Sequence, residues 1–171
     1  MTIQRLDHVS VVVDDLEAAK AFFVELGMEL EGEAPIEGPW VDRVNGLDGV
    51  RVNIAMMRTP DGHGGLELTK FHTPTAISAE PENALGNTLG LRSIMFVVDD
   101  IDATVAGLRA HGAELVGEVA QYQDSYRAAT GPHNTRVPKD TGPASPIAGL
   151  ARNTDRDRMY SCGFCSHRSR Q

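Results

Sequence analysis

The chain opens with alternating residues, many of them β-branched, between positions 3 and 13. A period of two predicts a β-strand there and divides its side chains between two faces. One face carries Asp7 and three valines, so we expect the strand to be covered on both faces along much of its length. The other face carries the chemistry of interest, because it holds Leu6, His8, Ser10 and Val12.

An amphipathic helix is predicted directly after this strand. Asp14 and Asp15 offer an N-cap and negative charge to its first turn. Gly27 accepts the left-handed conformation that commonly ends a helix. The apolar positions in between have the spacing of one buried stripe, and they are Leu16, Ala19, Phe22, Phe23 and Leu26.

Three further strands are expected in the first half of the chain. Prolines 35 and 39 with Gly38 predict an irregular loop over 34–40, long enough to border a pocket. This loop holds Trp40, the only tryptophan. In the last strand, alternation places Glu67 and Thr69 on one face. The strands are expected at 28–33, 50–57 and 66–71.

The first part of the chain is repeated at an offset of 85 positions. Residues 6–16 align with 91–101, and residues 27–33 align with 112–118. Such a repeat predicts two copies of one structural unit. The copies differ at one informative position, because His8 aligns with Ser93.

The repeat also predicts the organisation of the chain. In the second copy we expect a strand at 91–98, a helix at about 101–111 and a strand at 113–119, with weaker strand signals at 122–129 and 146–151. Agreement between the copies fails beyond about residue 127. The expected boundaries are a first module at 3–72, a linker at 73–90, a degenerate second module at 91–152 and a disordered tail at 153–171.

Composition narrows the class of partner. A net charge of −8 over 171 residues opposes general binding to nucleic acid or to an anionic membrane, because such partners need a basic surface. No apolar run is long enough to span a bilayer. The first residues lack a basic segment followed by an apolar stretch, so no signal peptide is expected and we place the protein in the cytoplasm.

His8 and Glu67 are the candidate site residues of the first module. If both strands face one concave surface, a neutral imidazole and a carboxylate would meet there, and together they suit Zn, Fe, Mn, Co or Ni. Metal sites usually take three or more protein groups. The alternative is therefore an inner-face histidine with its hydrogen bonds satisfied and a solvated glutamate.

The repeated strand–helix–strand–strand–strand pattern resembles the vicinal oxygen chelate superfamily. The resemblance rests on the segment Leu6–Leu16, on its second copy and on Gly27 before the second strand, and it covers roughly residues 3–129. That superfamily includes glyoxalase I, extradiol dioxygenases and bleomycin-binding proteins. The resemblance implies an α+β fold in which paired βαβββ modules form a curved mixed sheet, the glyoxalase/bleomycin resistance/dioxygenase fold.

The resemblance also implies that the first and last strands of each module supply one metal ligand apiece. His8 and Glu67 match those positions in module one. In module two, Ser93 and Arg152 stand there instead, and neither suits a cation. Other groups would have to complete the shell, and the candidates are His72, Tyr122 and Asp124.

Two functions follow from the resemblance. The first is a divalent-metal-dependent lyase, isomerase or dioxygenase acting on a small molecule with vicinal oxygens, in which Glu67 is a ligand or a catalytic base. The second is a metal-free small-molecule-binding protein of the bleomycin-resistance kind. Besides these two functions, a third possibility is an altered copy with little activity. A homodimer is expected, because an incomplete second module leaves a sheet edge open. The residues expected to line the substrate pocket are Trp40, Arg92, Ser93 and Tyr122.

Overall fold

The fold is described from a computed structural model of the 171-residue chain. It describes residues 3–78, 87–91, 93–110, 113, 115, 118–122, 126–129, 149–153 and 160–162. The chain divides into two compact units, the first centred on Met1–Ile77 and the second on the elements from Ser78 onward.

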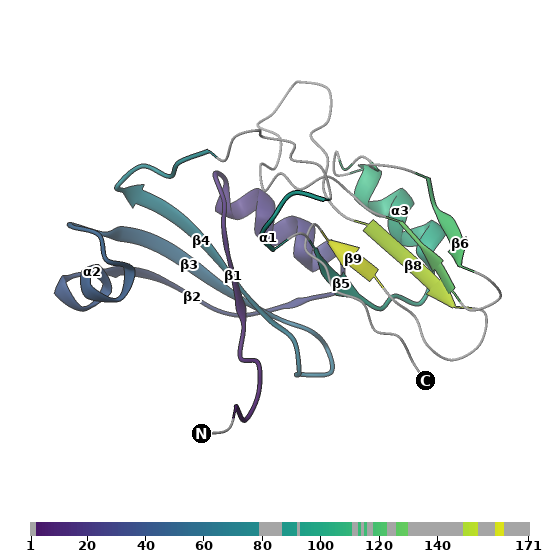
Figure 1. Ribbon diagram of the computed structural model, residues 1–171, viewed down its shortest axis with the longest axis horizontal. Coiled ribbons are helices and arrows are strands. Elements are labelled where there is room, and N and C mark those ends of the chain that lie inside the picture. Colours follow the sequence, from purple (N-terminus) through teal and green to yellow (C-terminus); the bar gives the residue numbers. More distant parts are fainter. Residues whose placement is uncertain are drawn as a thin grey trace. The chain divides into compact units, whose positions relative to one another are not determined.

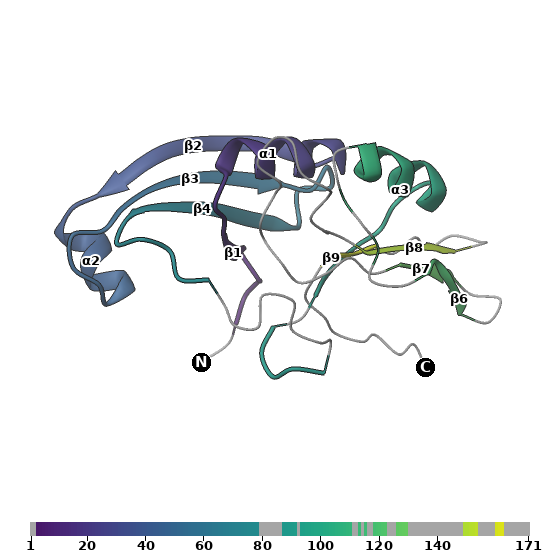
Figure 2. The same ribbon diagram turned by 90° about the horizontal axis from the view of Figure 1, so that it is seen from above.

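The first unit is a four-stranded mixed sheet with the strand order β1-β4-β3-β2. β1 and β4 are parallel, whereas β3 pairs antiparallel with both β4 and β2. Figure 2 shows β2 and β3 bending along their length, so the sheet is curved as expected. The strands are β1 (Val9–Val12), β2 (Glu29–Glu37), β3 (Arg51–Arg58) and β4 (Gly65–Thr73).

Helix α1 (Leu16–Glu25) packs against β2, β3 and β4, as Figure 1 shows. It begins as the sequence predicts, because the Asp15 side chain accepts a hydrogen bond from the Ala18 backbone N–H at 3.1 Å. Its buried stripe and the strand residues beneath it form the core of the unit. This core contains Leu16, Ala19, Phe22, Phe23, Val11, Ala55, Met57, Leu66 and Leu68.

The prediction of an irregular loop over 34–40 is wrong. β2 continues through Pro35 to Glu37, and helix α2 (Pro39–Asn45) follows at once. β2 is an edge strand, so the missing N–H of Pro35 need not break the sheet. Pro39 stands at the first position of α2, where its fixed φ favours a helix. Both prolines therefore lie within regular structure.

A second apolar cluster lies where α2 follows β2. Val41 of α2 packs with Val50 and Val52, and three half-buried side chains of the sheet join them, namely Ile36, Ile54 and Phe71. Register places Ile54 beside Thr69, and Phe71 follows Thr69 by two residues. This cluster therefore shares the face of the sheet that carries Glu67, opposite to Leu68 and the α1 core.

The second unit contains one helix and a sheet with the strand order β5-β9-β8-β7-β6 among its described residues. Helix α3 (Ile101–Ala110) has the bounds of α1 shifted by 85, which confirms the repeat at the helix. Arg127 binds Asp102 through two hydrogen bonds of 2.6 and 2.8 Å, and these tie β7 to α3. The strands are β5 (Ile94–Phe96), β6 (Ala120–Tyr122), β7 (Tyr126–Ala128), β8 (Gly149–Asn153) and β9 (Tyr160–Cys162).

Pairing in the second sheet departs from the first. β5 pairs antiparallel with β9, whereas its counterpart β1 pairs in parallel with β4. β9 falls within 153–171, where a disordered tail is expected from composition. Of the strand expected at 113–119, the described residues 113, 115, 118 and 119 lie outside any strand, and the others fall outside the described part of the chain. No helix among the described residues has the length and apolar character that crossing a membrane requires.

Candidate functional site

His8 and Glu67 meet on the face of the first sheet opposite α1. Ser10 pairs in register with Glu67, and His8 precedes Ser10 by two residues, so all three side chains share one face. The distance from His8 Nε2 to Glu67 Oε2 is 4.0 Å, and the two side chains are 35% and 24% exposed. Parallel pairing of β1 with β4 therefore joins two residues that lie far apart in sequence.

Two hydroxyl groups hold the other oxygen of Glu67. Oε1 accepts a hydrogen bond from Ser10 Oγ at 2.8 Å and another from Thr69 Oγ1 at 2.8 Å. Thr69 is a buried polar residue. Because Oε1 is engaged twice, the carboxylate turns Oε2 toward His8.

Asp7 orients the imidazole of His8. Its Oδ2 lies 3.1 Å from His8 Nδ1, and its Oδ1 accepts a hydrogen bond from Arg5. These contacts lower the pKa of Asp7, with the hydrogen bond to His8 as the largest cause and Arg5 as the next. An ionised Asp7 can only accept, so it selects the tautomer with the proton on Nδ1. His8 Nε2 is the ring nitrogen that faces Glu67.

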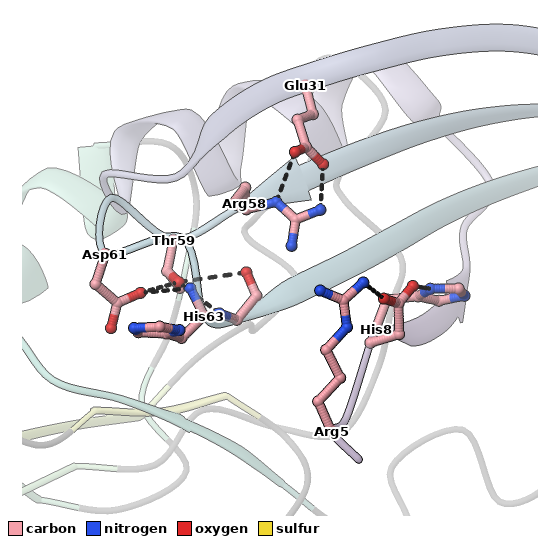
Figure 3. A network of polar contacts seen from close by, with 9 residues as sticks. Arg5, His8, Glu31, Arg58, Thr59, Asp61 and His63 are labelled. Carbon is pink, nitrogen blue, oxygen red and sulfur yellow. Dashed lines mark hydrogen bonds and ion pairs between the residues drawn. The ribbon is translucent and has the colours of Figure 1, made fainter.

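Figure 3 shows two further groups of polar contacts in the first unit, besides the contact of His8. Arg58 donates two hydrogen bonds to Glu31, of 2.7 Å and 2.5 Å, which lowers the pKa of Glu31 and raises that of Arg58. In the turn between β3 and β4, Asp61 accepts hydrogen bonds from Thr59 Oγ1 and the His63 backbone N–H, which lower its pKa. These contacts join β2 to β3 and close the turn that leads into Gly65.

The remaining residues named from the sequence lie elsewhere. Trp40 is on α2 and is 53% exposed, at the end of the sheet where Glu37 pairs with Arg51 rather than at the end near His8. Ser93 lies directly before β5 and is half-buried. Tyr122 ends β6, and Arg152 is on β8, both in the second unit. Arg92 and Asp124 fall outside the described residues.

The suggestion that His72 completes a shell with Glu67 is wrong. The register of β3 with β4 shifts at His72, so its face is given by its partner Asn53, which pairs with Lys70 on the face opposite to Glu67. His72 Nε2 lies 3.2 Å from Asn53 Oδ1. His72 is therefore a partner of β3 on the other side of the sheet.

The chemistry of His8 and Glu67 suits half of a metal site. An imidazole nitrogen whose other ring N–H binds a carboxylate, facing a carboxylate oxygen, is a common donor arrangement for first-row metals. Two ligand atoms of one tetrahedral cation lie about 3.4 Å apart. His8 Nε2 and Glu67 Oε2 lie 4.0 Å apart, so they would have to approach each other by about half an ångström to bind one cation. Within the described part of the chain, no cluster of three or more His, Cys, Asp or Glu residues could hold a metal.

Sequence reasoning did not assign roles to Asp7, Ser10 and Thr69. The period-two pattern contained a usable signal for two of them, because it places Ser10 on the face of His8 and Thr69 on the face of Glu67. Their convergence depends on the β1–β4 register, which becomes visible only in the structure.

Comparison with known proteins gives a consistent result. A structure of a glyoxalase family protein from Bacillus cereus is 47% identical, with a TM-score of 0.75, over 90% of this chain and 96% of that one. The uncharacterized protein YaeR of Escherichia coli (strain K12) is 29% identical over 113 residues, which are 66% of this chain and 74% of YaeR. The crystal structure of SMU.1112c, 23% identical with a TM-score of 0.50, covers 77% of this chain and 91% of its own and shares the fold.

The repeat, the curved mixed sheet and these likenesses agree with the family comparison. Residues 5–140 match the family described as the Glyoxalase/Bleomycin resistance protein/Dioxygenase superfamily. This chain therefore belongs to the glyoxalase/bleomycin resistance protein/dioxygenase superfamily.

Proposed function

We propose that this protein is a divalent-metal-dependent enzyme acting on a small molecule with vicinal oxygens, as a lyase, an isomerase or a dioxygenase. The observation that carries the proposal is the approach of His8 Nε2 to Glu67 Oε2 at 4.0 Å. His8 and Glu67 would hold the cation, which would be Fe, Zn, Ni, Co or Mn, because imidazole and carboxylate suit these ions. When bound, the ion supplies Lewis-acid stabilisation of negative charge on the substrate oxygens.

The protein's own groups have separate roles in this proposal. Asp7 keeps the proton on Nδ1 of His8, so that Nε2 presents its lone pair. Glu67 Oε2 either binds the cation or accepts a proton from the substrate, because Oε1 is already engaged by two hydroxyls. Half-buried apolar side chains on the same face, Ile54 and Phe71, would exclude water from one side of the substrate.

Metal analysis of the purified protein tests the proposal. We expect stoichiometric Fe, Zn, Ni, Co or Mn in the wild type and its loss in both His8→Ala and Glu67→Ala. Adding the metal should raise the unfolding temperature of the wild type and not that of His8→Ala or Glu67→Ala, because a ligand specific for the folded state stabilises it by mass action. His72→Ala is the matched control, since His72 lies on the opposite face of β4.

A metal-free binding function is the second candidate, and one observation favours it. Ser93 and Arg152 stand where the repeat and the family resemblance would place two further ligands, and neither is a good donor for a cation. The same face would then hold a small molecule through apolar contacts and a few polar anchors. No metal in the wild type, and no thermal shift on adding one, would select this function.

We also propose that the protein is a cytoplasmic homodimer. Within the described part of the chain β1 is an edge strand of the first sheet, and an edge strand can pair with a strand of another chain. Light scattering coupled to gel filtration should give a mass near twice 18.5 kDa. A single-chain mass at micromolar concentration would contradict this proposal.

A further inference from the structure

The two hydroxyls on Glu67 have a geometry that constrains their protons. Ser10 Oγ and Thr69 Oγ1 both lie 2.8 Å from Glu67 Oε1, and they lie 3.3 Å from each other. A hydroxyl has one proton to donate, and an ionised carboxylate can only accept. Both protons therefore point to Oε1, and neither remains for the 3.3 Å contact.

This arrangement fixes which oxygen of Glu67 faces His8. The terminal torsion of a glutamate side chain is broad and roughly two-fold, so an unrestrained carboxylate turns readily. Two hydrogen bonds to one oxygen oppose that rotation and leave Oε2 directed at His8 Nε2. Hydrogen bonds to an ionised acceptor are stronger than those between neutral groups.

The two hydroxyls come from different strands. Ser10 is on β1, the strand that follows His8, and Thr69 is on β4, two residues beyond Glu67. Ser10 thus ties Glu67 to the strand that carries the imidazole, whereas Thr69 braces it within its own strand. Thr69 is only 5% exposed, so water competes little for its hydrogen bond.

We propose that Ser10 and Thr69 are positioning residues, which hold Oε1 of Glu67 so that Oε2 alone is presented to a divalent cation beside His8. This inference rests on the proposed metal-dependent function and deepens it. Outer groups that orient a metal ligand typically change metal affinity about 10- to 100-fold when they are removed.

The test is a calorimetric titration of apo protein with Ni²⁺ and with Zn²⁺. Thr69→Val keeps the shape of the side chain and removes the hydroxyl, and Ser10→Ala removes the other hydroxyl. We expect each variant to bind metal about tenfold or more weakly than the wild type. Thr69→Ser and Ser10→Thr keep the hydroxyl and should retain the metal affinity of the wild type. Thr73→Val is the matched control on β4, because its hydroxyl accepts from Arg51 instead.

A double-mutant cycle separates positioning from a general structural role. Because Glu67→Ala is expected to lose the metal, the cycle is measured as the unfolding free energy of the apo protein. Thr69→Val should cost less in a Glu67→Ala background than in the wild type, since the acceptor of its hydrogen bond is gone. An equal loss of unfolding free energy in both backgrounds would overturn the inference. Wild-type metal affinity in both Thr69→Val and Ser10→Ala would also overturn the inference, but it would leave the proposed function intact. A wild type that binds neither metal would overturn both the proposed function and this inference.

Discussion

Gly65 lies beside the backbone that carries His8, on the neighbouring strand of the sheet. A Cβ atom at position 65 would lie 2.7 Å from the Asp7 carbonyl oxygen and 3.2 Å from the Cβ of His8. Contacts this short require the neighbouring backbone to move. The absence of a side chain at Gly65 therefore permits the close approach of the segment before β1 to the start of β4, and with it the spacing of His8 and Glu67.

We expect Gly65→Ala to separate His8 from Glu67. Over-packing of this kind typically costs about 1–3 kcal/mol of unfolding free energy. Because the displaced segment includes His8, metal affinity should fall as well, by about tenfold or more. Thermal unfolding and Ni²⁺ titration measure the two effects. Gly32→Ala on β2 is the control, because a Cβ there meets nothing within 4 Å, and equal behaviour of the two variants would contradict the argument.

Asp7 should make stability depend on pH in the acid range. Its pKa lies below the ordinary value of 3.8, chiefly through the hydrogen bond to His8 and then through Arg5. Between the lowered pKa of the folded state and the ordinary pKa of the unfolded state, the unfolded chain binds more protons than the folded one. The stability that Asp7 contributes is therefore complete above the ordinary pKa and is lost as the pH falls through the lowered pKa. Asp7→Asn should therefore unfold at a lower temperature than the wild type at neutral pH, with the gap closing as pH falls below the ordinary carboxyl pKa of 3.8 and through the lowered one. The gap is expected to be small because Asp7 is exposed. A gap that is constant with pH would refute the assignment.

The elements that the sequence predicted well are those in which one physical cause dominates. Both copies of the helix follow a single buried stripe behind an acidic N-cap, and both were expected within about one residue. The loop expected over 34–40 was wrong because proline is compatible with regular structure in two settings, an edge strand and the first turn of a helix. At an edge strand Pro35 loses no hydrogen bond, and at a helix start Pro39 is favourable. Edge position depends on strand order, which one sequence does not contain.

The candidate site was predictable as a pair but not as a network. Alternation and the family resemblance singled out His8 and Glu67, and the structure brings them together. The hydroxyls of Ser10 and Thr69 act through the register of a parallel pair whose strands lie more than 50 residues apart in sequence. Register over that distance is set by the packing of the whole sheet, so local patterns carried no information on it.

The N-cap of α1 gives a prediction about stability alone. Asp15→Ala removes the acceptor of the Ala18 N–H and should lower the unfolding free energy by about 1 kcal/mol. For a chain of this length that change corresponds to a fall of roughly 2–4 °C in Tm. Asp15→Asn retains an acceptor and should lose much less. Circular dichroism melts of the three proteins measure the effect, and an Asn variant as unstable as the Ala variant would exclude the capping role.

Leu68 and Thr69 are neighbours on β4 with different expected effects on metal affinity. Leu68 is completely buried on the α1 side of the sheet, so Leu68→Ala leaves a cavity and should cost about 2–5 kcal/mol. Its side chain points away from Glu67, so the metal affinity of the folded variant should stay near that of the wild type. Thr69→Val should instead weaken metal binding, and loss of its hydrogen bond to Glu67 should cost roughly 1.5–3 kcal/mol of unfolding free energy. Denaturant unfolding with calorimetric titration separates the two, and Leu30→Ala controls for the loss of an exposed leucine, since Leu30 is 47% exposed. If Leu68→Ala weakened metal binding as strongly as Thr69→Val, the two faces of β4 would not be independent, and the site would depend on the core rather than on the hydroxyls.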